Sequence, residues 1–290
     1  MLHSVFFIIN PISGPLYPIL PVIARAMKRY GLEWEIKISR SSEESYTHAK
    51  EALRQKVDAV VVYGGDGTIM EVARALCQTE MPLVILPGGT ANVLAKELNI
   101  PLDPAEAIKV LGKKKPTRRE LDMGLCNTKP FILRVSTGIL ADMVKTTTRS
   151  RKRNLGTLGY IVSALEHLSK PNSCLYSLKL DDQEEEIEGV ALMIANSANL
   201  GVSGLSLVPN AKVDDGKLDV IVITQADLKS LLSMVKGSVT QQKAPSLRRF
   251  KVSTVIVKMK PVQTVLLDDE IVPMTTLDIQ VLPKAVTILL

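Results

Sequence analysis

Three short glycine-containing segments carry the residues of this sequence that are best suited to chemistry. Each follows a run of apolar residues and precedes a helical pattern, and they span Asn10–Gly14, Gly64–Thr68 and Pro87–Asn92. Glycine lets the backbone turn sharply and bring its N–H groups against a ligand without a Cβ in the way. The N-terminus of a helix adds unpaired donors and the positive end of the helix dipole. The three segments therefore predict a phosphate-binding site.

Polar side chains within these segments refine that prediction. Thr68 and Thr90 lie where a hydroxyl can cap a helix or bond a phosphate oxygen. Asp66 would repel a phosphate unless Mg²⁺ lay between them, because a hard divalent cation takes oxygen ligands from both groups. The alternative for Asp66 is the cap of a helix N-terminus, a common use of aspartate. We favour the metal or phosphate role.

Two familiar nucleotide-binding motifs are absent from the sequence. There is no Gly-x-x-x-x-Gly-Lys-Ser/Thr string, which excludes a P-loop enzyme. There is also no Gly-x-Gly-x-x-Gly motif after the first apolar run, which weakens a dehydrogenase interpretation. The three cysteines and three histidines show neither disulfide nor metal-ligand spacing.

The elements that must position the three segments alternate between buried strands and helices. This alternation predicts a parallel sheet with helices on both faces, in which all strand-to-helix loops meet at one edge. The predicted strands span residues 4–9, 34–39, 58–63 and 83–86. The predicted helices span residues 16–30, 47–55, 69–76, 91–98 and 103–111.

The pattern changes after the basic run at residues 113–119, where two-residue alternation begins. Tyr176–Leu180 and Leu277–Val281 are examples, and such half-buried strands are typical of an antiparallel sandwich. Helical patterns interrupt them at residues 158–168 and 227–235. We therefore predict an α/β nucleotide-binding domain at 1–121 and a β-rich, sandwich-like domain at 122–290, with the C-terminal segment free to pack back on the first. We expect Trp34 in the core and Glu184–Glu186 at an exposed hairpin tip.

Composition narrows the class of protein further. Of the 290 residues, 46% are hydrophobic and 23% charged, which excludes a disordered chain. Aromatic residues make up 4%, and no nucleic-acid-binding signature occurs, so no nucleic acid is expected as a partner. The net charge of +6 suits an anionic ligand or membrane. No stretch approaches the ~20 apolar residues of a membrane span, so we expect a cytoplasmic protein with peripheral membrane association.

The three glycine segments together resemble the signatures of the bacterial diacylglycerol kinase family. This is the soluble lipid-kinase group related to sphingosine kinases. The likeness continues through Leu121–Gly124, Val208–Leu218 and Leu267–Glu270, so it covers nearly the whole chain.

The resemblance implies roles for individual residues. It implies that Glu270 is the general base that takes the proton from a lipid hydroxyl, and that Asp66 and Asp122 are supporting catalytic carboxylates. It implies a structural Mg²⁺ held by Asp215 and the carbonyls of Lys212 and Lys217. The residues implied to bind ATP are Asn10, Pro11, Ile12, Ser13, Gly14, Ser39, Gly65, Asp66, Gly67, Thr68, Ile69, Met70, Glu71, Gly89, Thr90 and Asn92.

The sequence departs from the family pattern at a few positions. Met70 stands where the family commonly has Asn, Asp269 replaces the Gly before Glu270, and Val93-Leu94 replaces Asp-Phe. These changes bear on substrate preference and rate more than on the reaction class. The alternative for Glu270 is an ordinary solvated carboxylate in an acidic cluster with Asp268 and Asp269.

These observations predict an ATP-dependent lipid kinase. It would transfer the γ-phosphate of Mg·ATP to a lipid hydroxyl, with diacylglycerol as the default acceptor and phosphatidic acid as product. One alternative is a soluble-metabolite kinase of the NAD kinase type, and another is a non-catalytic lipid- or nucleotide-binding regulator. The basic residues from Lys145 to Arg153 are expected to contact an anionic membrane. The sequence leaves a homodimer open.

Overall fold

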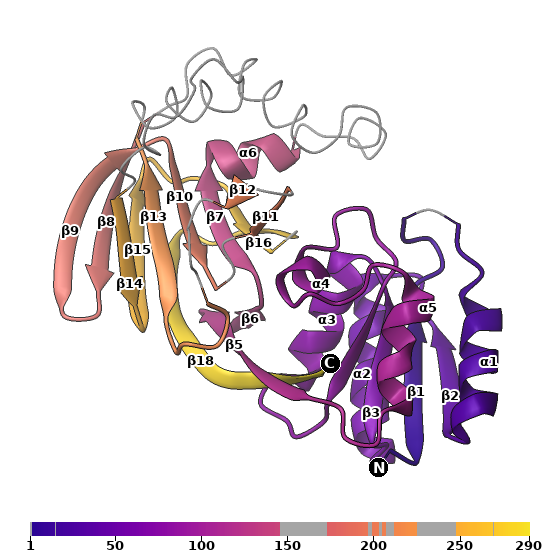
Figure 1. Cartoon of the computed structure of the whole chain (residues 1–290). Helices are drawn as coiled ribbons and strands as arrows, with labels where there is room; N and C mark the ends of the chain where they lie inside the picture. Colours follow the sequence, from indigo (N-terminus) through magenta and orange to yellow (C-terminus); the bar gives the residue numbers. More distant parts are fainter. Residues whose placement is uncertain are drawn as a thin grey trace, which may run out of the picture.

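A computed structural model of the chain describes residues 2–14, 16–145, 173–196, 199–202, 205–206, 212–224, 248–268 and 270–290. The described residues form two regions, one of helices and parallel strands and one of antiparallel strands, which Figure 1 shows side by side. Among these residues, none of the helices is long and apolar enough to cross a bilayer.

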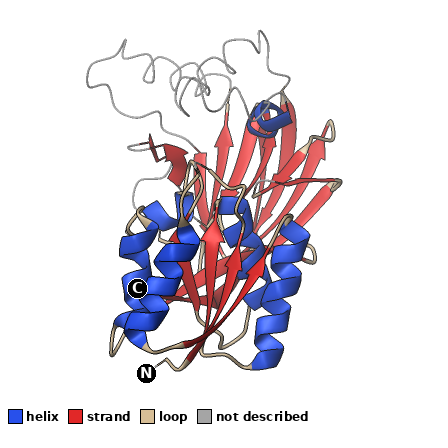
Figure 2. Ribbon diagram, turned by 90° about the vertical axis from the view of Figure 1, so that its right-hand side faces the viewer, coloured by secondary structure: helices blue, strands red, loops and turns tan. Residues whose placement is uncertain are grey.

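The first region is a parallel sheet with helices on both faces, as Figure 2 shows. Its strands follow the order β2-β1-β3-β4, and the apolar runs of β1, β3 and β4 are buried. Continuous apolar runs are typical of strands covered on both sides. The strands are β1 (Ser4–Ile9), β2 (Glu33–Ile38), β3 (Ala59–Gly64) and β4 (Leu83–Pro87). The helices are α1 (Ile19–Tyr30), α2 (Ser42–Gln55), α3 (Asp66–Leu76), α4 (Val93–Glu97) and α5 (Pro104–Ala107), and a 3₁₀ helix follows at Ile108–Gly112.

Capping residues decide where these helices begin and end. The Ser41 side chain accepts from the Glu44 backbone N–H, so α2 begins earlier than the predicted residue 47. Asp103 caps α5 in the same way. Gly31 ends α1 in the left-handed conformation, with φ at 66°. The apolar pattern predicted the end of α1 at residue 30 correctly but missed the start of α2.

The second region pairs two layers of antiparallel strands. One layer is a six-stranded sheet in the order β14-β13-β10-β7-β16-β17, and the other is the antiparallel part of the ten-stranded sheet that continues from the first region. Apolar side chains from both layers form a second core around Tyr176 and Phe131. The strands are β5 (Arg118–Cys126), β6 (Lys129–Phe131), β7 (Arg134–Gly138), β8 (Cys174–Leu180), β9 (Gln183–Gly189), β10 (Ala191–Ala195), β13 (Leu218–Ile223), β14 (Arg248–Val252), β15 (Thr254–Lys260), β16 (Val265–Leu267), β17 (Glu270–Val272) and β18 (Thr276–Leu289). A short helix α6 (Ile139–Lys145) follows β7, and β11 (Asn199–Val202) pairs with β12 (Leu205–Ser206).

This architecture confirms the predicted fold class, an α/β domain with a parallel sheet followed by an antiparallel sandwich-like domain. The proposed boundary at residue 121 falls inside β5 and stays a prediction. The helical patterns at 158–168 and 227–235 lie outside the described residues, as does most of the basic segment 145–153.

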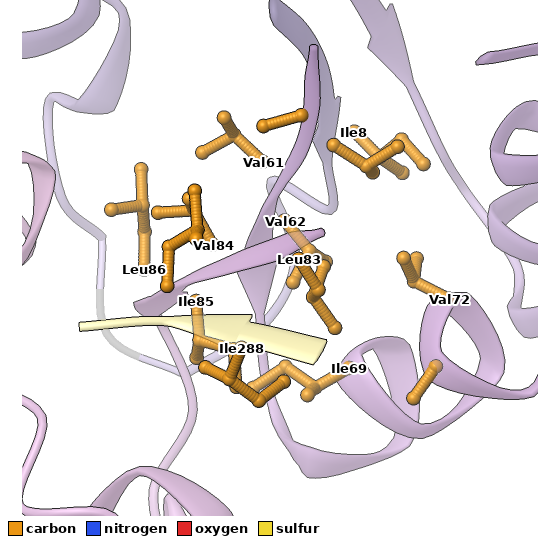
Figure 3. Packing of buried hydrophobic residues seen from close by; sticks show 14 of the residues in the cluster. Ile8, Val61, Val62, Ile69, Val72, Leu83, Val84, Ile85, Leu86 and Ile288 are labelled. Atoms are coloured by element: carbon orange, nitrogen blue, oxygen red, sulfur yellow. The ribbon is translucent and has the colours of Figure 1, made fainter. Parts of the chain in front are cut away.

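Strand β18 joins the two regions. Its first half pairs with β15, its length pairs with β5, and its end pairs in parallel with β4 through Ile288 and Leu83. Figure 1 shows this strand running from the sandwich to the helical region. Figure 3 shows Ile288 beside Ile85 and Ile69 in the first core. The last strand of the sequence is therefore a structural part of the first region.

Two expectations about individual residues were wrong. Trp34 is 44% exposed, because β2 is the edge strand of the sheet and one face of it meets solvent. Glu184–Glu186 lie within β9 and not at the hairpin tip, although Glu184 and Glu186 are exposed as expected; the hairpin turns at Asp181, which adopts a left-handed φ of 49°. The strand simply begins earlier than the acidic run suggested.

The Ile288 contact gives a stability prediction. Ile288 is fully buried, so Ile288→Ala removes packing at the junction and should lower the free energy of unfolding by about 2–5 kcal/mol. Ile38→Ala, at a position 44% exposed, should change it by less than about 0.5 kcal/mol. Urea unfolding of the two variants measures the difference. Equal effects would mean that β18 does not hold the first region together.

Candidate active site

The three glycine segments meet at one edge of the parallel sheet, where they touch through their backbones. A Cβ on Gly14 would lie 2.2 Å from the Gly88 carbonyl oxygen, and one on Gly89 would lie 2.6 Å from the Gly65 Cα. Gly14 also has a left-handed φ of 63°. Any side chain at these positions would push the loops apart, so the glycines allow the loops to converge.

Polar side chains fix the converged loops. The Asn10 side-chain amide donates to Thr68 Oγ1 at 3.0 Å, which ties the first loop to the second. Asn92, in a left-handed conformation, accepts from the Gly89 N–H at 2.9 Å and donates to the Gly89 carbonyl at 3.0 Å. The third loop is therefore closed by its own asparagine.

Asp66 links the second loop to the third. Its Oδ1 accepts from the backbone N–H of Val93 at 2.6 Å and, at 3.4 Å, from that of Leu94. The carboxylate thus caps the N-terminus of α4 across the loops rather than that of its own helix. This is the capping role that the sequence left as an alternative, while a metal or phosphate role for Asp66 stays a prediction.

The N-terminus of α3 differs from those of α2 and α5. Side chains of Ser41 and Asp103 cap the latter two helices, whereas the cap residue of α3 is Gly65, which has no side chain to bond the helix start. An added Cβ at Gly67, in its first turn, would meet nothing within 4 Å. The start of this eleven-residue helix therefore offers backbone donors and open space for an anion.

A pocket of about 560 Å³ extends from this helix to the edge of the sandwich. That volume is in the usual range for a small-molecule site. Both parts of the fold contribute, since α2 and α3 supply one wall and β6, β17 and the turn after β16 supply the other. The pocket is lined by Ser42, Glu43, Tyr46, Gly67, Met70, Glu71, Arg74, Lys129, Asp268 and Glu270. The glycine loop and the predicted base thus face one cavity.

Arg74 connects the walls of the pocket. Its side chain is 5% exposed, and its Nε donates to the Pro130 carbonyl at 2.8 Å. Its Nη1 pairs with Glu71 on the same helix and lies 3.6 Å from a Glu270 oxygen, and its Nη2 lies 3.4 Å from Asp268. A buried arginine in this position is stabilised because several acceptors surround it.

Asp268 is the buried partner of that arginine. It accepts from three successive backbone N–H groups, of Ile132 at 3.2 Å, Leu133 at 2.9 Å and Arg134 at 3.0 Å. Burial raises the pKa of Asp268, and these donors and the Arg74 guanidinium oppose that rise. Burial also raises the pKa of Glu71. The turn before Glu270 is thus anchored to the rest of the pocket.

Glu270 presents its carboxylate to the pocket. The side chain is 52% exposed, and its Oε2 pairs with Lys129 Nζ at 2.5 Å. A carboxylate that lines a cavity and keeps contact with solvent can accept a proton from a bound hydroxyl. The structure brings Glu270, the predicted base, and Gly67, of the predicted nucleotide loop, to the same pocket. The catalytic role of Glu270 stays a prediction.

Some residues predicted to bind nucleotide have their side chains turned elsewhere. Ser39 is fully buried, and its hydroxyl bonds the Ser41 carbonyl at 2.7 Å and Ser45 Oγ at 2.6 Å. Ile69 is fully buried in the first core, as Figure 3 shows. Only their backbone atoms could contact a ligand at the loops.

Asp122 and Asp215 lie together at a turn outside this pocket. Asp122 is buried, and it accepts from the Gly216 N–H at 2.5 Å and the Lys284 N–H at 2.8 Å. Asp215 accepts from the Lys217 N–H at 3.1 Å and forms an ion pair with Lys251. Asp122 therefore connects β5, this turn and β18, and it does not line the pocket.

The side chains at the turn bear on the structural Mg²⁺ that the resemblance implies. Both carboxylate oxygens of Asp215 are engaged, one by the Lys217 N–H and the other by the Lys251 ammonium. A divalent cation would have to displace the Lys251 ammonium from this carboxylate. The other implied ligands are backbone carbonyls, since among the described residues no group of three or more His, Cys, Asp or Glu could hold a metal ion. With Lys251 in place, the Asp215 carboxylate does not favour a divalent cation.

A thermal-shift measurement without nucleotide tests this fit. MgCl₂ should leave the Tm of the wild type unchanged, because Lys251 already neutralises Asp215. Lys251→Met frees the carboxylate oxygen, so Mg²⁺ should then raise the Tm. Lys284→Met removes a surface ion pair with Glu120 and serves as the matched control with no response. A rise in the wild-type Tm would show that Mg²⁺ displaces the lysine.

Arg74 and Lys129 are pocket residues that the sequence did not predict. Arg74 is a charged residue among the buried residues of α3, which was the available signal. The alternative for Glu270 placed Asp268 in a solvated acidic cluster, but Asp268 directly follows the apolar run Val265–Leu267 and is buried.

Two family models match this chain. A family model described as the diacylglycerol kinase catalytic domain matches residues 4–126, and one described as the YegS C-terminal NAD kinase beta sandwich-like domain matches residues 133–290. A probable lipid kinase YegS-like protein of Pseudomonas aeruginosa is 34% identical over 215 residues, covering 73% of this chain and 70% of its own length.

Other relatives agree. A diacylglycerol kinase of Staphylococcus saprophyticus is 29% identical over 229 residues, covering 77% of this chain and 74% of its own. A solved structure of a diacylglycerol kinase from Bacillus anthracis has the same fold, with a TM-score of 0.80 at 24% identity over 99% of this chain and 96% of that one. The chain therefore belongs to the lipid kinase family that combines a diacylglycerol kinase catalytic domain with a YegS-type C-terminal sandwich domain.

Proposed function

We propose that the protein is an ATP-dependent lipid kinase that transfers the γ-phosphate of Mg·ATP to a lipid hydroxyl. Diacylglycerol is the acceptor we favour, with phosphatidic acid as the product. The printed names of the relatives support the class, since they are lipid kinases or diacylglycerol kinases. Phosphatidylglycerol, a sphingoid base and an isoprenoid-like alcohol are the other acceptors to compare.

One observation carries the proposal. The pocket has the donor-rich start of α3 at Gly67 on one wall and the carboxylate of Glu270 on the other. Phosphoryl transfer depends on positioning and on stabilising charge, with a carboxylate near the attacking oxygen. This pocket offers both within one cavity.

The roles follow from that arrangement. The three converged loops and the first turn of α3 would hold the phosphates. The lipid hydroxyl oxygen attacks the γ-phosphorus, the bond between that phosphorus and the bridging oxygen breaks to release ADP, and Glu270 accepts the hydroxyl proton. Mg²⁺ enters with the nucleotide as part of the substrate, where it neutralises phosphate charge.

A lipid acceptor also requires contact with a membrane, which the net charge of +6 favours. Contact with an anionic bilayer and a homodimer both stay predictions, because the basic segment assigned to the membrane lies largely outside the described residues.

Phosphate transfer to lipid tests the proposal. Purified protein with labelled ATP and mixed micelles of each candidate lipid should give a labelled lipid. Glu270→Gln should lower kcat by about 100-fold or more, because the proton acceptor is lost, with little change in ATP affinity. Equal transfer by wild type and variant would remove Glu270 as the base. Transfer to NAD instead of lipid would favour the soluble-metabolite kinase, and no transfer at all the regulator.

A pair of glycine variants tests the phosphate site. Gly67→Ala adds a Cβ that meets nothing within 4 Å, so the Tm should stay unchanged while ATP affinity falls about tenfold or more if phosphates fill that space. Gly14→Ala should instead lower the Tm, because its Cβ would collide with Gly88. Isothermal titration calorimetry and thermal melting separate the effects. Normal ATP binding by Gly67→Ala would place the nucleotide elsewhere.

A further inference from the structure

Glu270 lies at an exposed edge of the sandwich, yet its carboxylate faces the pocket. Strand β17 has three residues and is the last strand of its sheet, and the Glu270 side chain is 52% exposed. A side chain at such a position has many rotamers available, and fixing it requires a partner. The partners come from elements outside its own sheet.

Two cations approach the Glu270 carboxylate from different elements. Lys129 on β6 places its Nζ 2.5 Å from Oε2, and Arg74 on α3 places its Nη1 at 3.6 Å from the same oxygen. The two side chains differ in how tightly their neighbours hold them. Arg74 is 5% exposed and is held by Pro130, Asp268 and Glu71, whereas Lys129 is 35% exposed. Arg74 is therefore fixed by its other partners, whereas Lys129 makes the closer contact with Glu270.

Lys129 is nevertheless well placed by its neighbours. The adjacent residue, Pro130, accepts the hydrogen bond from Arg74 Nε, so the backbone beside Lys129 is fixed to α3. From Gly67 to Arg74 this helix rises about 10 Å, at 1.5 Å per residue. One rigid helix thus fixes both the phosphate end of the pocket and the strand that carries Lys129.

We propose that Lys129 is a positioning residue for phosphoryl transfer, which holds the Glu270 carboxylate inside the pocket, where it accepts the proton of the acceptor hydroxyl. The inference deepens the proposed function and rests on it for its kinetic part. It assigns Lys129 no contact with the reacting atoms.

The charges around Glu270 explain why a second cation matters. Three other carboxyl groups face the pocket, Glu71 on α3, Asp268 after β16 and Glu43 on α2, and each disfavours a further negative charge. Arg74 and Lys129 are the cations that line it. Without Lys129, Arg74 is the one cation of this lining against four carboxyl groups, and their repulsion would move the exposed Glu270 side chain out of the pocket toward solvent.

The test compares Lys129→Met, Lys129→Arg and the control Lys109→Met, which removes an exposed ion pair with Glu106 on α5. With wild-type lipid kinase activity as reference, Lys129→Met should lower kcat at pH 7 about tenfold and leave the KM for ATP unchanged. Lys129→Arg should restore most of the lost kcat, and Lys109→Met should match the wild type.

A second readout does not depend on activity. Carbon-13 NMR of labelled glutamate, with Glu270 assigned by its loss in Glu270→Gln, reports the surroundings of its carboxylate at pH 7. The Glu270 signal should shift in Lys129→Met, return toward its wild-type position in Lys129→Arg and stay unchanged in Lys109→Met, whichever lipid is phosphorylated or even if none is. Identical Glu270 signals in the wild type and Lys129→Met would overturn the proposal. A loss of kcat that Lys129→Arg does not restore would also overturn it and would assign Lys129 to substrate binding.

Discussion

The close approach of three backbone turns at one edge of the parallel sheet is the constraint on which the rest of the site depends. Gly14 contacts Gly88 and Gly89 contacts Gly65 at distances that leave no room for a Cβ. The contact follows from parallel pairing of β1, β3 and β4, which ends each strand at the same edge. Because Asn92 closes the third turn and Asp66 bonds the first N–H groups of α4, the start of α3 is the helix end that is left to offer donors to an anion.

Helix α3 carries this arrangement to the second region. Gly67 in its first turn lines the pocket, and its Arg74 reaches the buried Asp268 that precedes Glu270. Separating these charged partners would leave a buried ion without compensation, which is strongly unfavourable. Strand β18 provides the second connection, since it leaves the sandwich and ends beside β4. The two walls of the pocket are therefore held by a charged contact and by a shared sheet.

Much of this fold could be predicted from the sequence, because its signals are local. Apolar runs such as Val60–Val62 indicate strands, and glycine segments after them indicate loops at one sheet edge. Helix boundaries depend on capping residues outside the apolar pattern. Ser41 caps α2, which therefore begins before the predicted residue 47. The exposure of Trp34 depends on which strand lies at the edge, which no local pattern fixes.

The candidate site likewise contains residues that the sequence predicts and residues that it does not. Its loop residues and Glu270 belong to recognisable motifs, whereas Arg74 and Asp268 are 194 positions apart and meet only in the fold. The capping role of Asp66 and the pairing of Asp215 with Lys251 also depend on long-range contacts. A crystal structure with a non-hydrolysable ATP analogue tests the central claim most directly. We predict its β- and γ-phosphates against the backbone of Gly67 and Thr68, with the γ-phosphate directed toward Glu270; a triphosphate bound away from the three loops would contradict the account.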